Sequence, residues 1–94
     1  MTPISAIVLT KNEEASLSEC LASLTWADEL LVVDSFSTDG TVAIAQARGA
    51  RVVQHAFVNY AAQRNYAQEI AAYDWVLHID ADERVTPALA AEIA

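Results

Sequence analysis

The chain is 94 residues long, which is enough for one small domain and too short for two separate cores. Apolar residues make up 54% of it and charged residues 19%, with two Gly and two Pro, which excludes a disordered tail, a collagen-like repeat and a flexible linker. The net charge of −8 argues against a nucleic-acid partner, and the one cysteine, Cys20, excludes a disulfide framework and a multi-cysteine zinc site.

Residues 4–9 form a short run rich in β-branched side chains, with little alternation between polar and apolar positions. This pattern predicts a strand that is covered on both faces. The run lacks the basic start and the length of a secretory signal, and no window reaches the roughly 20 apolar residues that span a bilayer. We therefore expect a cytoplasmic protein, and attachment of a longer protein to the periphery of the inner membrane stays open.

A helix is expected next, because Ser16-Leu17-Ser18-Glu19 has the spacing of a capping box and leucines follow at helical intervals. Residues 30–33 predict a second buried strand, which ends at Asp34. An alanine-rich helix is expected over 41–48, and Gly49 occupies the position of a left-handed helix stop.

The second half of the chain repeats this cycle. Val52-Val53 marks a third strand, residues 60–72 have helical spacing, and residues 75–79 predict a fourth strand that ends at Asp80. Thr86-Pro87 has the pattern of an N-cap followed by proline at the first helical position, so a last helix should begin there.

The alternation of strands and helices predicts an α/β fold with a doubly wound, mainly parallel sheet in a three-layer α/β/α arrangement. Ligands of such sheets bind beyond the carboxyl ends of the strands, where the strand order reverses. Thr10, Asp34, Asp80 and Asp82 all follow predicted strands. We therefore expect these polar side chains to gather at one crevice.

The segment from His78 to Glu83 carries the strongest local signal. Asp80 and Asp82, two positions apart at a strand end, can bind one hard cation together with substrate phosphates, and a divalent ion would relieve their mutual repulsion. A solvated acidic turn before the next helix is an equally good interpretation of the tripeptide taken alone. Glu83 is better explained as a surface acid at the start of a helix than as a ligand of the cation.

Asp34 and Arg64 each allow two interpretations. Asp34 ends an apolar strand, where it could accept a hydrogen bond from a base edge or a ribose hydroxyl, or could close a turn by bonding to loop amides. Arg64 is one of five basic residues and suits phosphate recognition, although an ordinary surface arginine fits equally well. The aromatic residues fit packing better than a stacking platform, and His78 fits a structural role inside a strand.

Four stretches together resemble the start of a family 2 glycosyltransferase with the GT-A fold, in particular the bacterial enzymes that build the lipopolysaccharide core. They are residues 7–14 (IVLTKNEE), 32–41 (VVDSFSTDGT), 63–65 (QRN) and 80–83 (DADE), and the resemblance extends over essentially the whole chain. Each motif alone is weak to moderate, whereas four in this order at these spacings are highly specific.

The resemblance implies that this part of the fold binds a nucleotide-diphosphate sugar. The matching positions are Thr10, Glu13, Asp34, Arg64 and Asp80. Thr10 and Glu13 would line the nucleoside pocket, Asp34 would read the base, Arg64 would lie near the nucleotide, and Asp80 near the ribose or the sugar. Asp82 would be the direct ligand of Mg²⁺ or Mn²⁺, which bridges the diphosphate and neutralises charge as the nucleotide leaves.

Two positions depart from the pattern of many relatives. Many relatives have a second acid directly after the position of Asp34, where this chain has Ser35. Many also have a glycine at the next position, where this chain has Phe36. Phe36 would be strained if the loop needed a left-handed residue at that position.

The resemblance also implies an inverting transfer to a glycan or lipid-linked acceptor, with the general base supplied by sequence beyond Ala94. We therefore predict that residues 1–94 are the donor-binding portion of a longer GT-A domain, contain no catalytic base and turn over no substrate alone. Strands absent from the sheet would leave an exposed edge, which favours self-association.

Two alternatives stay open. A haloacid-dehalogenase-type phosphotransferase also uses Asp-x-Asp after a strand, but its motif continues to Thr or Val where this chain has Arg84. A non-catalytic nucleotide-binding or assembly module is the other. The chain contains no G-x-G-x-x-G, Walker A or G-x-S-x-G motif, so dinucleotide, P-loop and α/β-hydrolase functions lose their main support.

Overall fold

A computed structural model describes residues 2–93, in which strands and helices alternate along the chain. The elements are β1 (Ile4–Thr10), α1 (Leu17–Ala22), β2 (Glu29–Asp34), α2 (Thr41–Ala47), β3 (Arg51–Gln54), α3 (Tyr60–Ile70), β4 (Trp75–His78) and α4 (Pro87–Ile93). This order confirms the predicted alternation. The strands pair in parallel in the order β3-β2-β1-β4, which confirms the parallel sheet.

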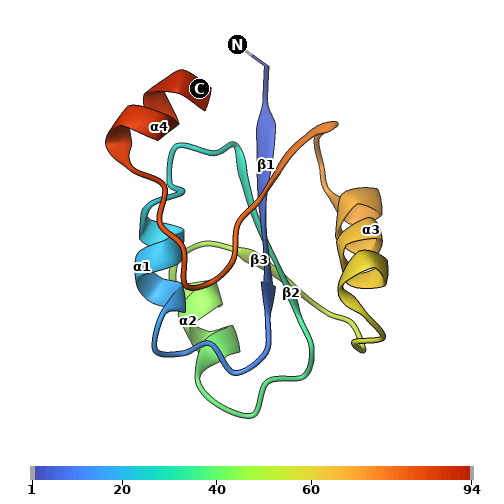
Figure 1. Cartoon of the computed structure of the whole chain (residues 1–94). Helices are drawn as coiled ribbons and strands as arrows, with labels where there is room; N and C mark the ends of the chain where they lie inside the picture. Colours follow the sequence, from blue (N-terminus) through green and yellow to red (C-terminus); the bar gives the residue numbers. More distant parts are fainter. Residues whose placement is uncertain (1, 94) are drawn as a thin grey trace.

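The sheet lies between two layers of helices, with α1 and α2 on one face and α3 on the other (Figure 1). Ala6 and Val8 of β1 pack with α1 and α2, whereas Ile7 packs with α3. Successive residues of a strand point to opposite faces, so both faces of β1 are buried. This explains why residues 4–9 show so little polar alternation, and it confirms the three-layer arrangement.

The strand order reverses at β1, because β2 and β3 follow on one side of it and β4 lies on the other. In an open parallel sheet, the carboxyl ends of the strands beside such a reversal form the ligand crevice. The segments that follow β1, β2 and β4 all turn at the same end of the molecule, at the bottom of Figure 1. The fold therefore brings the polar loops together, as the sequence predicts.

The predicted stop after α2 and the predicted start of α4 are confirmed, whereas α3, expected over 60–72, ends at Ile70. Gly49 has a φ of 81° just after α2, and the Thr86 hydroxyl oxygen accepts a hydrogen bond from the Leu89 N–H at 3.1 Å at the start of α4. Helix α1 begins directly after Ser16, but the Ser16 side chain forms no capping hydrogen bond, so the predicted capping box is wrong in its bonding. No helix within residues 2–93 has the combination of length and apolar character needed to cross a bilayer.

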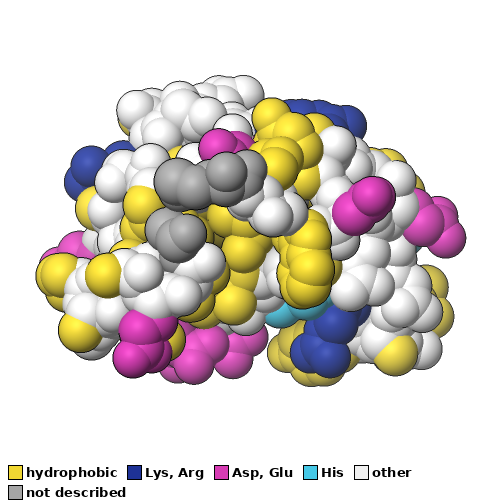
Figure 2. Space-filling view, turned by 90° about the horizontal axis from the view of Figure 1, so that it is seen from above, with side chains coloured by type: hydrophobic (Ala, Val, Ile, Leu, Met, Phe, Trp, Pro, Cys, Tyr) yellow, Lys and Arg dark blue, Asp and Glu magenta, His cyan; other side chains and the backbone are white. Residues whose placement is uncertain are grey.

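The opposite end of the molecule, where β1 begins, presents open apolar surface. Figure 2 shows hydrophobic side chains near the centre of this face, with acidic side chains at its lower left and right margins. A hollow of about 310 Å³ is lined by Thr2, Pro3, Ala72, Tyr73, Asp74 and Trp75. Trp75 belongs to the edge strand β4 and is 65% exposed.

Candidate functional site

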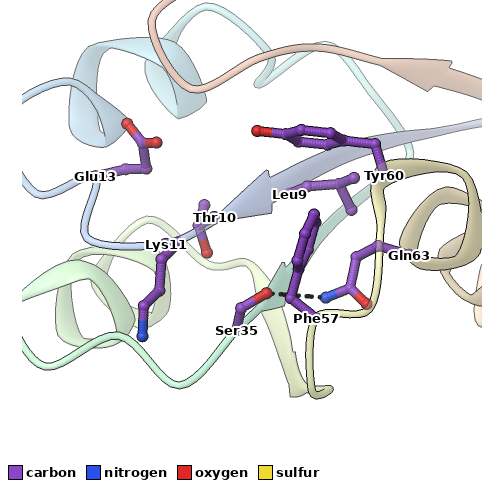
Figure 3. Close-up of a pocket in the computed structure, with 8 residues that line it drawn as sticks. All are labelled: Leu9, Thr10, Lys11, Glu13, Ser35, Phe57, Tyr60 and Gln63. Atoms are coloured by element: carbon purple, nitrogen blue, oxygen red, sulfur yellow. Dashed lines mark hydrogen bonds between the residues drawn. The ribbon is translucent and has the colours of Figure 1, made fainter.

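Two neighbouring cavities lie at the carboxyl ends of the strands. The β1–β2 cavity has a volume of about 380 Å³ and is lined by Leu9, Thr10, Lys11, Glu13, Ser35, Phe57, Tyr60 and Gln63 (Figure 3). The β1–β4 cavity has a volume of about 440 Å³ and is lined by Ile7, Leu9, Glu13, Tyr60, Arg64, His78, Ile79, Asp80, Ala81 and Asp82. Leu9, Glu13 and Tyr60 contribute to both, so the cavities are adjacent and can share one elongated ligand.

The β1–β4 cavity contains charges of both signs. Glu13, Asp80 and Asp82 bring carboxylates to it, and Arg64 brings a guanidinium group from α3. None of these four side chains belongs to an ion pair among residues 2–93. Burial raises the pKa of Glu13, and repulsion from Asp82, Asp39 and Asp80 raises it further. A ligand that carries both cationic and anionic groups would relieve this repulsion and engage Arg64.

The turn that carries Asp80 and Asp82 is held in place by its own hydrogen bonds. The Asp80 N–H donates to the Glu83 carboxylate at 2.9 Å, and the Glu83 N–H donates to the Asp80 carbonyl oxygen at 2.9 Å. The Cys20 thiol on α1 donates a hydrogen bond to the same carbonyl oxygen at 3.5 Å. Burial raises the pKa of this thiol to about 11, so the thiol stays protonated and can act as the donor. Glu83 thus closes the turn, while Asp80 and Asp82 stay exposed.

The residues present fit a metal ion that is bound together with a phosphate ligand. Within residues 2–93, no three His, Cys, Asp or Glu side chains gather closely enough to hold a metal by themselves. The side-chain oxygens of Asp80 and Asp82 accept no hydrogen bond from those residues, so they are available to a cation. Mg²⁺ and similar ions need only one or two carboxylates when substrate phosphates and waters complete their coordination.

Asp34 lies beneath the cavities and lines neither of them. Its side chain is 0% exposed, and its carboxylate accepts from the Thr10 hydroxyl at 2.6 Å, the Ser37 hydroxyl at 2.6 Å and the Ser37 N–H at 2.8 Å. Burial acts to raise the pKa of Asp34, but the hydrogen bonds from Ser37 and Thr10 outweigh it and lower the pKa overall. This geometry matches the turn-closing interpretation of Asp34.

The other residues singled out from the sequence reach the cavity walls. Thr10 lines the β1–β2 cavity, Glu13 lines both cavities, and Arg64, Asp80 and Asp82 line the β1–β4 cavity. The expected single crevice is therefore two adjoining cavities, with Asp34 as a support under them.

Several lining residues were given no role in ligand binding from the sequence. Phe57 and Tyr60 are 48% and 70% exposed at the cavity walls, although aromatic residues are expected to pack. Gln63 is 1% exposed. It belongs to the same sequence motif as Arg64, residues 63–65. His78 lines the β1–β4 cavity, and its Nδ1 atom is buried without a hydrogen-bond partner among residues 2–93.

Sequence comparison identifies relatives along nearly the whole chain. The profile of glycosyl transferase family 2 matches residues 5–93. An uncharacterised glycosyltransferase of Rickettsia felis is 44% identical over 94 residues, which cover 99% of this chain and 33% of the relative. The lipopolysaccharide core biosynthesis glycosyltransferase LpsC of Rhizobium meliloti is 40% identical over 92 residues, covering 93% and 34%. The chain thus spans about one third of the length of these relatives.

The solved structures of two enzymes, TarS and glucosyl-3-phosphoglycerate synthase, have the same fold as this chain. S. aureus TarS in complex with UDP-GlcNAc aligns with a TM-score of 0.85 and 29% identity, over 98% of this chain and 30% of TarS. A second structure is glucosyl-3-phosphoglycerate synthase from Mycobacterium tuberculosis in complex with Mn²⁺, UDP-glucose and phosphoglyceric acid. It aligns with a TM-score of 0.77 and 28% identity, over 88% of this chain and 35% of the synthase. The fold described above is therefore the GT-A arrangement of these enzymes.

Proposed function

The chain belongs to glycosyl transferase family 2, and from that membership we propose that its two cavities bind a nucleotide-diphosphate sugar, the donor in a sugar-transfer reaction. The observation that carries the proposal is the pairing of the cavities. One has aromatic walls and the other has Arg64 with three carboxylates, and Glu13 and Tyr60 connect them. A nucleotide sugar has the same two parts, a planar base with its ribose and a charged diphosphate.

The nucleoside occupies the β1–β2 cavity in this proposal, next to Thr10 and Glu13. The diphosphate occupies the β1–β4 cavity, where the Arg64 guanidinium can donate to phosphate oxygens. Asp80 lies toward the ribose or the sugar. Asp34 contributes to the nucleotide site indirectly, because its carboxylate holds the Thr10 hydroxyl at the cavity floor.

Asp82 is the proposed direct ligand of Mg²⁺ or Mn²⁺, with Asp80 beside it. A divalent cation there supplies charge neutralisation for a leaving nucleoside diphosphate. The residues of this chain orient the donor: Arg64 holds phosphate oxygens, and the hydrogen-bonded turn around Glu83 fixes the two aspartates. The complex of a structural neighbour with Mn²⁺ and UDP-glucose supports a divalent cation as part of the donor site.

The complete reaction requires groups that residues 1–94 do not supply in this proposal. We expect an inverting transfer to a glycan or lipid-linked acceptor in the bacterial cytoplasm, with lipopolysaccharide core assembly as the favoured setting because of the similarity to LpsC. The general base and the acceptor site would lie in sequence beyond Ala94. The chain by itself should therefore bind the donor without transferring or hydrolysing its sugar.

A thermal-shift titration tests the proposal directly. UDP with Mn²⁺ should raise the melting temperature of the chain, and EDTA should abolish the rise; at about a hundredfold excess over Kd the stabilisation is about 2.7 kcal/mol. The variants Asp82→Ala and Arg64→Ala should lose most of this shift. Asp74→Ala is the matched control, because Asp74 is an exposed acid that lines neither cavity.

Three outcomes would contradict the proposal. An absent shift with every nucleoside diphosphate would favour a purely structural module. A shift with beryllofluoride and none with nucleotides would favour a phosphotransferase. Release of free sugar from a nucleotide sugar by the 94-residue chain would show that a catalytic base lies within it.

A further inference from the structure

The β1–β2 cavity contains a hydrogen-bond chain whose direction follows from the chemistry of its atoms. The His55 carbonyl oxygen can only accept, so the Gln63 side-chain nitrogen, 3.1 Å away, donates to it. The Gln63 side-chain oxygen then faces His55 Nδ1 at 2.7 Å and accepts a hydrogen bond from the N–H there. The second N–H of the Gln63 amide donates to the Ser35 hydroxyl oxygen at 3.1 Å. Gln63 is thereby held in one orientation.

This orientation leaves the Ser35 hydroxyl proton free. Gln63 occupies one lone pair of the Ser35 oxygen, and no group among residues 2–93 accepts from that hydroxyl. Ser35 lines the cavity, so the free proton is available to a ligand there. The β1–β2 cavity therefore presents a hydrogen-bond donor at its polar end.

Burial, ring stacking and a backbone hydrogen bond hold the supports of this donor in place. Gln63 is 1% exposed, and the His55 ring stacks on Tyr66 with ring centroids 3.7 Å apart. The Ser35 N–H donates to the Thr10 carbonyl oxygen at 2.9 Å, which fixes its backbone against β1. A donor held from both sides loses little conformational entropy when a ligand binds.

An aromatic wall stands beside this donor. Phe57 is 48% exposed and meets Tyr60 edge to face, with ring centroids 5.1 Å apart. In Figure 3 both rings lie on the same side of the cavity as Gln63, while Glu13 and Lys11 lie on the other side. An exposed aromatic face next to one oriented polar group is the combination that stacks a flat heterocycle and reads its edge.

We infer that Ser35 and Phe57 are the residues that select the nucleobase of the donor, with Gln63 as the positioning residue. The Ser35 hydroxyl donates to a carbonyl oxygen on the base edge while Phe57 stacks on the base. This donor fits an acceptor on the base edge, such as a ring carbonyl oxygen of uracil. The inference rests on the proposed function and deepens it, because Asp34, the acid expected to read the base, has its oxygens engaged below the cavity.

Isothermal titration with three probes, each with Mn²⁺, tests this inference: UDP, ADP and inorganic pyrophosphate. Ser35→Ala should weaken UDP binding by about 2- to 10-fold through the lost hydrogen bond. Phe57→Ala should weaken it by about 5- to 100-fold through lost stacking. Neither variant should change the affinity for pyrophosphate, and Ser35→Ala should change the ratio of the UDP affinity to the ADP affinity.

Matched variants separate base recognition from general damage. Val58→Ala removes an apolar side chain that is 75% exposed and lines neither cavity, so it should leave all three affinities unchanged. Phe57→Trp and Ser35→Thr should restore UDP binding, since they keep the aromatic face and the hydroxyl. Gln63→Glu replaces the donor that holds Ser35 with an acceptor, so it should weaken UDP and leave pyrophosphate unaffected.

The results distinguish this inference from the function it rests on. The inference is overturned if UDP binds no more tightly than pyrophosphate, or if Ser35→Ala and Phe57→Ala change the affinities for UDP and pyrophosphate equally. In either case the proposed binding of the diphosphate in the β1–β4 cavity is unaffected. If the unaltered protein binds none of the three probes, the proposed function and the inference both fail.

Discussion

The buried carboxylate of Asp34 connects the end of β1 to the loop that follows β2, since it accepts hydrogen bonds from Thr10 and Ser37. Its folded pKa lies below the ordinary value of 3.8, because the hydrogen bonds outweigh the effect of burial. A lowered folded pKa means that the unfolded chain takes up the proton first as the pH falls. The stabilisation from Asp34 is therefore complete well above pH 3.8 and is lost as the pH falls through the folded pKa.

The variant Asp34→Asn should lower the free energy of unfolding at pH 7 by about 2 kcal/mol, because an amide cannot accept all of these donors. It should also show a shallower decline of stability below about pH 4 than the unaltered chain. Urea unfolding at a series of pH values measures both effects. The control is Asp28→Asn, an exposed carboxylate with one backbone donor, which should change stability by less than about 1 kcal/mol. An equally steep acid decline in Asp34→Asn would contradict the argument.

Phe36 adopts a left-handed conformation, with a φ of 56°, which is the strained case considered from the sequence. The loop holds it there from both sides: its N–H donates to Gln54 at 2.9 Å, and its carbonyl oxygen accepts from Lys11 at 2.9 Å. A left-handed residue other than glycine costs about 1–2 kcal/mol. The Phe36 side chain is 58% exposed, so its packing offsets little of this strain.

Phe36→Gly should therefore raise the free energy of unfolding by about 0.5 kcal/mol, after the greater flexibility of glycine in the unfolded chain is subtracted. Thr38→Gly, in the same loop but without a positive φ, should lower it by about 0.5–1 kcal/mol. Chemical denaturation of the two variants side by side measures the difference. Equal losses in both would show that the backbone at position 36 carries no strain.

Helix α3 shows how one element divides its residues between support and ligand contact. Asn59 caps it by accepting from the Ala62 N–H at 2.8 Å. Successive helical residues point in directions about 100° apart, so Gln63 enters the interior while Arg64 faces the β1–β4 cavity. The helix thereby supplies the positioning residue of one cavity and the cation of the other.

The end of α2 depends on a glycine. Gly49 has a φ of 81° with open space where a Cβ would lie, so Gly49→Ala should cost about 1–2 kcal/mol through backbone strain alone. In a domain of this size each kcal/mol lowers the melting temperature by about 4–8 °C. Calorimetry of Gly49→Ala against Gly40→Ala tests this. A Cβ at Gly40 meets only the flexible end of Glu14 at 3.1 Å, so a loss in Gly40→Ala as large as in Gly49→Ala would contradict the strain argument.

At the scale of the whole molecule, the sheet has an open edge along β4. This strand pairs only with β1 within residues 2–93, and Trp75 on it is 65% exposed beside an apolar hollow. Unpaired strand edges with apolar side chains recruit further strands. In relatives about three times as long, additional chain is available to cover such an edge.

We expect the 94-residue chain to self-associate through this edge, with a sedimentation coefficient that rises with protein concentration. Trp75→Lys should reduce the rise, because it places a charge on the edge strand. Leu89→Lys introduces the same charge on α4, 43% exposed and away from the sheet edge, and should leave the rise unchanged. A single monomeric species at all concentrations, or equal effects of both variants, would exclude this edge as the contact.

The sequence by itself determined the order of elements, the parallel sheet and the family, because strand periodicity, helix signals and four spaced motifs are local properties of the chain. It also indicated Asp80 and Asp82, since the carboxyl ends of parallel strands meet at one edge, and Arg64 through the motif of residues 63–65. Only the tertiary structure decided that Asp34 supports the site from below, while Ser35 and Phe57 reach the cavity. The hydrogen bonds from Thr10 to Asp34 and from Gln63 to Ser35 join residues more than 20 positions apart, and no local pattern reveals them.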